Sequence, residues 1–108
     1  MMTPEGKVKA KVKAILNKLG VYYFMPRGTA FGRAGVPDII CCVNGQFLAI
    51  ECKANGNKPS MLQEMEIASI KKSGGMAIVV NELDIEQQRV EKTCAILTNT
   101  LQSTTAEG

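Results

Sequence analysis

The sequence predicts an α/β fold, a mixed four-stranded sheet with helices on both faces, in the order α-β-β-β-α-β-α. Three features indicate this class. Asn44-Gly45 joins two short apolar runs, and this dipeptide is a strong hairpin signal because a type I′ turn needs a positive φ at both central residues. The continuous apolar run Met76–Val80 is typical of a strand covered on both faces. Apolar residues at helical spacing lie before, between and after these runs.

The first helix is predicted to begin at Thr3-Pro4-Glu5, with threonine as the N-cap, proline in the first turn and an acid beside it. Gly20 is the predicted C-terminal cap. The apolar stripe of this helix comprises Val8, Val12, Ile15, Leu16 and Leu19. Glu5 falls on the same inward face, an unusual place for a carboxylate. Either the helix dipole favours an acid in the first turn, or Glu5 has a functional role.

Residues 21–25 are predicted to form a strand, and residues 26–35 a flexible loop that contains Arg27, Arg33 and three glycines. Glycine allows the backbone of such a loop to approach a phosphate closely, and the arginines would then contact it. The same composition also suits a plain surface connection. Both interpretations remain open from the sequence.

The hairpin register brings charged residues together. A two-residue loop places Val43 opposite Gln46, so Asp38 lies opposite Glu51 on the same face, and Lys53 points to that face as well. Directly opposed like charges destabilise an ordinary sheet, so this pair requires a cation, and carboxylates suit Mg²⁺ or Mn²⁺. A neighbouring lysine can orient a water or balance developing charge. The alternative is an accidental charge cluster, and a single bulge would turn Asp38 away.

A capping box, Ser60-Met61-Leu62-Gln63, predicts the start of the next helix, which continues to about Lys72. Its apolar stripe predicts a largely buried helix, and comprises Met61, Leu62, Met65, Ile67, Ala68 and Ile70. After the strand 76–80, which a right-handed crossover could set parallel to the strand that carries Glu51, Asp84 is expected to cap a last helix. The face of that helix comprises Val90, Cys94, Leu97 and Leu101.

The length of 108 residues suits one domain, which we place at residues 1–101, with a polar and frayed tail at 102–108. The net charge of +3 permits nucleic-acid binding without demanding it. The absence of histidine excludes Ser-His and Cys-His nucleophilic machinery. The four cysteines lack zinc-ligand spacing and are expected to be small buried hydrophobes. Without a long apolar stretch or a signal peptide, a cytoplasmic location is expected.

The ordered set of Pro37-Asp38, Glu51, Lys53 and Gln63 resembles the PD-(D/E)xK nuclease superfamily. More narrowly, the chain resembles the virus-type replication-repair nuclease (VRR-NUC) domain, with stand-alone members in phages and bacteria that are similar to Holliday junction resolvases. The likeness extends from about residue 3 to residue 80, and includes the glycine-rich approach at residues 32–35. It implies a three-layer α-β-α core of the restriction-endonuclease type.

The resemblance also implies roles for individual residues. Asp38, Glu51 and the backbone carbonyl of Cys52 would bind Mg²⁺ or Mn²⁺. Lys53 would orient the attacking water or stabilise transition-state charge, and Gln63 would position the substrate or the lysine, although its capping role competes with this function.

By the same resemblance, Glu5 would supply a further acid, directly or through water. The implied activity is metal-dependent endonucleolytic hydrolysis of DNA, selective for branched structures such as junctions or flaps, by a homodimer. Arg27 and Arg33 are the candidate DNA contacts. The rival hypotheses are a non-catalytic nucleic-acid-binding module with a structural metal ion, and an interaction protein in which buried charges fix a unique packing.

Overall fold

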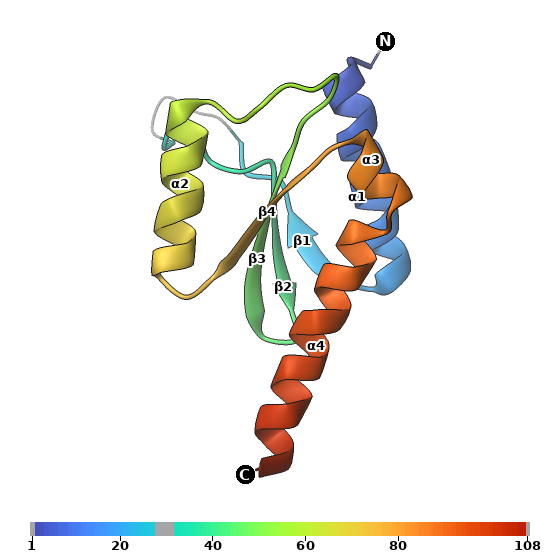
Figure 1. Ribbon diagram of the computed structural model, residues 1–108, viewed down its shortest axis with the longest axis vertical. Helices are drawn as coiled ribbons and strands as arrows, with labels where there is room; N and C mark the ends of the chain where they lie inside the picture. Colours follow the sequence, from blue (N-terminus) through green and yellow to red (C-terminus); the bar gives the residue numbers. More distant parts are fainter. Residues whose placement is uncertain (1, 28–31, 108) are drawn as a thin grey trace.

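The computed structural model describes residues 2–27 and 32–107, with side chains described up to Asn99. It confirms the α/β class and the three layers (Figure 1). Helix α2 lies on one side of the sheet, and helices α1, α3 and α4 lie on the other. The elements are α1 (Pro4–Leu19), β1 (Tyr22–Phe24), β2 (Ile39–Val43), β3 (Gln46–Cys52), α2 (Met61–Lys72), β4 (Met76–Val80), α3 (Glu82–Glu86) and α4 (Arg89–Glu107).

The sheet has the order β1-β2-β3-β4 and is mixed, as predicted. β1 and β2 pair antiparallel, β2 and β3 form the antiparallel hairpin, and β4 lies parallel to β3 after the crossover through α2. Val43 pairs with Gln46, and Asn44 and Gly45 have φ of 52° and 85°. The tight Asn-Gly turn and the predicted register are therefore confirmed, and this register places Asp38 level with Glu51.

Helix α1 has the predicted boundaries. The Thr3 hydroxyl accepts a hydrogen bond from the Gly6 amide at 2.9 Å, and Gly20 ends the helix with a φ of 72°. Glycine adopts this left-handed conformation with little steric cost, because it has no Cβ. The core lies between α1, the start of α4 and one face of the sheet, and includes Val8, Val12, Leu16, Ile39, Leu48, Ile50, Val80 and Val90.

Helix α2 begins at the predicted capping box. The Ser60 hydroxyl accepts from the Gln63 amide at 3.2 Å, and the Gln63 side-chain oxygen accepts from the Ser60 amide at 2.8 Å. The prediction of a largely buried helix is wrong, because none of its residues is buried, and Met61 and Met65 are 77% and 61% exposed. Helices α1, α3 and α4 lie on the opposite side of the sheet (Figure 1). The sheet therefore covers only one edge of the apolar stripe of α2.

The last helical region differs from the prediction in two ways. Asn81, not Asp84, is the N-cap, and Asp84 completes a capping box three residues later. Gln88, with a φ of 58°, then separates the short helix α3 from α4. Val90, Cys94 and Leu97 are buried as expected. The Leu101 side chain lies outside the described part, and the α4 backbone continues as far as Glu107, through the segment expected to form a tail.

Three of the four cysteines are buried as predicted, and Cys42 is exposed, which corrects that part of the expectation. Cys42 alternates along β2 with the buried Cys41 and Val43, so it points to the sheet face opposite the core. Burial raises the pKa of Cys41 and of Cys52 to about 12, so both remain neutral thiols. Across residues 2–27 and 32–107, no helix has both the length and the apolar character needed to cross a bilayer.

Candidate active site

Three carboxylates from separate elements meet at one end of the sheet. Glu5 comes from the first turn of α1, Asp38 immediately precedes β2, and Glu51 lies near the end of β3. One oxygen of each lies within 4.8 Å of the other two. Helical periodicity predicts that Glu5 lies on the inward face of α1. Its place in this cluster is compatible with a functional role for the residue.

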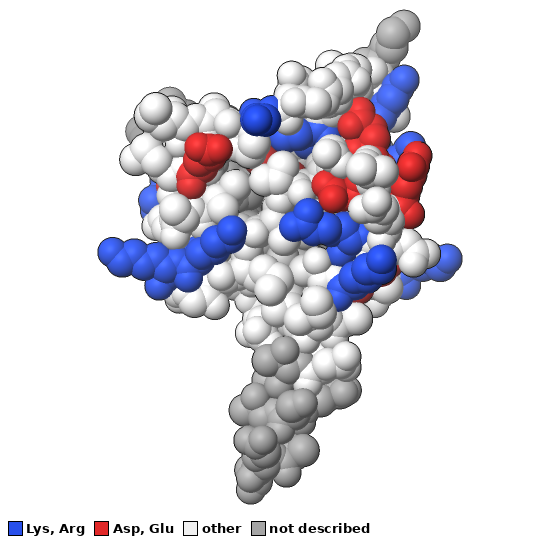
Figure 2. Space-filling model, in the orientation of Figure 1, with Lys and Arg blue, Asp and Glu red and all other residues white. Residues whose placement is uncertain are grey.

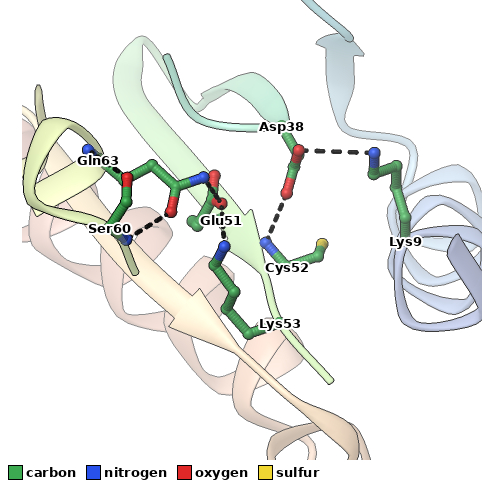
Figure 3. A network of polar contacts seen from close by, with 7 residues as sticks. All are labelled: Lys9, Asp38, Glu51, Cys52, Lys53, Ser60 and Gln63. Atoms are coloured by element: carbon green, nitrogen blue, oxygen red, sulfur yellow. Dashed lines mark hydrogen bonds and ion pairs between the residues drawn. The ribbon is translucent and has the colours of Figure 1, made fainter. Parts of the chain in front are cut away.

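Glu51 is the most enclosed member of this group, with 1% of its surface exposed. One carboxylate oxygen, Oε2, accepts a hydrogen bond from the Gln63 side-chain amide at 2.6 Å and lies 3.4 Å from the Lys53 ammonium (Figure 3). The other, Oε1, is buried without a hydrogen-bond partner among the described residues. Burial, followed by the nearby charge of Asp38, raises the pKa of Glu51 to about 7, although Lys53 opposes the rise.

Gln63 has two contacts that the sequence presented as alternatives. Its carbonyl oxygen closes the capping box with Ser60, while its amide nitrogen donates to Glu51. The start of α2 therefore holds a carboxylate of β3 in a fixed orientation.

Gly35 packs against the backbone of the first turn of α2. Its φ is 80°, and a Cβ there would lie 2.6 Å from the backbone carbonyl carbon and oxygen of Leu62. Both the left-handed conformation and the close approach require glycine. The loop that precedes β2 thus packs directly on the backbone that carries Gln63.

Asp38 is held by two contacts. Its Oδ2 accepts a hydrogen bond from the Cys52 amide at 2.8 Å, and its Oδ1 lies 3.5 Å from the Lys9 ammonium. Lys9 is not among the site residues that the sequence motifs predict. A signal for it was available, because Lys9 follows Glu5 by one helical turn and so lies on the same face of α1.

The donor set fits a divalent cation such as Mg²⁺ or Mn²⁺. Carboxylate oxygens are the hard ligands that these ions prefer. The buried, unpartnered Oε1 of Glu51 is the specific observation, because a buried polar atom without a partner is costly and a cation would satisfy it. Glu5, Asp38 and Glu51 would hold the ion, with the carbonyl of Cys52 as a further predicted ligand.

The two arginines are not brought to this cluster. Arg33 forms an ion pair with Glu66 of α2, in which Nη2 of the arginine lies 2.9 Å from Oε2 of the glutamate. Arg27 is exposed on the loop after β1. Residues 28–31 of the predicted phosphate-approaching loop lie outside the described residues.

Comparisons with known proteins find likenesses in sequence and in structure. No family model matches the chain. Over 55 residues the chain is 40% identical to "Putative nuclease p44" of Acyrthosiphon pisum secondary endosymbiont phage 1, a match that covers 50% of this chain and 59% of that protein. A solved structure described as "VRR_NUC domain" superposes with a TM-score of 0.67 at 24% identity, and covers 83% of this chain and 97% of its own. The chain therefore has the VRR-NUC domain fold that its motifs resembled.

Proposed function

We propose that the protein is a divalent-metal-dependent endonuclease that hydrolyses phosphodiester bonds in DNA. The observation that carries the proposal is the convergence of Glu5, Asp38 and Glu51, with Lys53 and Gln63 both in contact with Glu51. The name of the phage relative, a nuclease, agrees with this proposal.

The residues around the proposed metal site have different roles. A bound divalent ion would lower the pKa of a water and offset charge on the scissile phosphate. Gln63 holds Glu51 through Oε2, which leaves Oε1 without a hydrogen-bond partner among the described residues. The Lys53 ammonium, held at 3.4 Å from Glu51, has donors left to orient the attacking water or to stabilise charge on the phosphate in the transition state.

We propose branched DNA, a junction or a flap, as the preferred substrate. On the face shown in Figure 2, basic side chains lie on both flanks and also in the middle of the molecule. This distribution supports contacts to phosphates at several points and recognition of duplex shape more than the reading of bases.

We further propose that two copies of the chain assemble. Tyr22, Cys42 and Phe47 form a row across β1, β2 and β3, on the part of the sheet face that α2 leaves open, and Tyr22 is 71% exposed. An uncharged apolar face is compatible with a second copy of itself. Light scattering on the wild-type protein and on Tyr22→Asp tests this proposal, and a wild-type monomer at all concentrations would reject it.

The central experiment is a cleavage panel over junction, flap, nicked, duplex and single-stranded DNA, with Mg²⁺, Mn²⁺ or chelator. We expect metal-dependent cutting, highest on a branched substrate, and its loss in Asp38→Asn and Glu51→Gln with the fold retained. Binding without cutting on every substrate would favour the non-catalytic module with a structural ion.

A further inference from the structure

Lys9 makes an ion pair that its position in the helix does not favour. Glu5 lies four residues before it, and a Glu-to-Lys pair at this spacing is the favourable orientation on a helix surface. The ammonium of Lys9 instead reaches across to Asp38, at 3.5 Å, and no ion pair between Lys9 and Glu5 occurs in the described part of the chain. The lysine is therefore directed toward the carboxylate cluster.

The contact leaves donors of Lys9 free. A charge-assisted hydrogen bond between an ammonium and a carboxylate is about 2.7–2.9 Å long, so the 3.5 Å separation from Asp38 is a loose ion pair. The side chain of Lys9 remains 32% exposed, and an ammonium carries three donors. A second anion can thus bind the same group.

A polar cavity of about 340 Å³ lies beside this lysine, lined by Thr3, Glu5, Lys9, Asn55 and Asn57 among others. The two asparagines among the lining residues have side chains that can donate hydrogen bonds. Lys9 approaches the carboxylates from α1 on the Asp38 side, whereas Lys53 approaches on the Glu51 side (Figure 3). The cavity is thus a place for an anion that is separate from the position served by Lys53.

The formal charges of the cluster also favour a role for a second lysine in binding an anion. Three ionised carboxylates and one lysine leave a formal charge of minus two, which a divalent ion would only neutralise. With Lys9 included, the loaded site carries one formal positive charge, which attracts a phosphate.

We propose that Lys9 binds a non-scissile phosphate of the substrate strand in the cavity beside Glu5, and so positions the strand over the metal site. The inference rests on the proposed nuclease function. It assigns a non-scissile phosphate of the DNA to the cavity beside Lys9. Lys9 is a positioning residue, because the phosphate that it would contact is not the one that reacts.

The test compares Lys9→Met, which keeps the aliphatic stem, with Lys9→Arg, which keeps the charge. Lys11→Met is the matched control, because Lys11 is exposed on the same helix and points to the opposite side, about 200° around the axis. For each variant, kcat, KM for DNA and the half-saturating Mg²⁺ concentration are measured. A thermal melt checks that each variant is folded.

We expect Lys9→Met to raise KM about tenfold or more, as for the loss of a hydrogen bond to a charged group, with kcat nearly unchanged. Lys9→Arg should restore KM, and Lys11→Met should resemble the wild type. In contrast, a lysine that only holds Asp38 in place would change kcat and the Mg²⁺ requirement, and this pattern overturns the proposal.

A binding experiment separates this inference from the nuclease proposal. In the Glu51→Gln background, Lys9→Met should flatten the slope of log affinity against log salt by about 0.7–0.9, the share of one phosphate contact. If the wild type cuts no DNA, the nuclease proposal fails. The salt dependence of binding then still tests whether Lys9 contacts a phosphate. An unchanged slope, or no binding to DNA, overturns the role of Lys9.

Discussion

Replacing Glu51 by glutamine should stabilise the metal-free protein at high pH. The pKa of Glu51 rises from its ordinary value of 4.5 to about 7, chiefly because the carboxyl is buried and secondly because Asp38 is near. One pKa unit corresponds to about 1.4 kcal/mol, so ionised Glu51 lowers the free energy of unfolding by roughly 3 kcal/mol. Glutamine has the same shape and cannot ionise.

The sign of the pH dependence follows from proton binding. Between pH 4.5 and about 7 the folded protein holds the Glu51 proton more tightly than the unfolded chain does, so stability falls as pH rises through this window. Below pH 4.5 the carboxyl is neutral in both states, and the difference between the wild type and Glu51→Gln should disappear. Above pH 7 the full difference should be present.

Urea unfolding in chelator, at pH 4.5 and at pH 8, measures this effect. Glu86→Gln is the control, because Glu86 is exposed on α3 and no ion pair involves it within the described residues. Addition of Mg²⁺ at pH 8 should then stabilise the wild type more than Glu51→Gln, by mass action on the folded state. Equal stabilities at pH 8, or a less stable Glu51→Gln, would refute the argument that burial destabilises the ionised carboxylate.

The other predictions concern backbone packing, chemistry and the arginine loop. Gly35→Ala should cost about 1–3 kcal/mol more than Gly74→Ala in urea unfolding, because both glycines have a positive φ but only Gly35 meets backbone at 2.6 Å; equal costs would contradict this. Lys53→Met should abolish cutting and leave the melting temperature within a few degrees, whereas retained cutting in single-turnover assays would remove Lys53 from the chemistry. Arg27→Ala combined with Arg33→Ala should weaken DNA binding and flatten its salt dependence if the loop contacts phosphates, and an unchanged slope would exclude the loop.

The hairpin and its charged residues could be predicted because local rules determine them. An Asn-Gly turn fixes the pairing of Val43 with Gln46, and the two-residue period of a strand then carries Asp38 and Glu51 to one face. Glu5 and Gln63 could be predicted for the same reason, since a helix start and its face are local features of the chain.

The contacts that were missed depend on how the elements pack in three dimensions. Lys9 reaches Asp38 only because the first turns of α1 pack beside the start of β2, and helical periodicity does not specify that packing. The exposure of Met61 and Met65 likewise depends on how much of α2 the sheet covers. Asn81 and Asp84 are both good capping residues, and the sequence alone did not indicate which of them ends the strand and which belongs to the first turn of α3.

The double contact of Gln63 couples local helix stability to the geometry of the site. If the first turn of α2 unwinds, the capping box with Ser60 opens and the amide that holds Glu51 is lost in the same event. Fraying at a helix end is normally of little consequence, because it occurs with a small free energy and affects only its own turn. Here the opening of a helix end also removes one of the contacts that order the Glu51 carboxylate, and hydrogen exchange at the Gln63 backbone amide would report this opening.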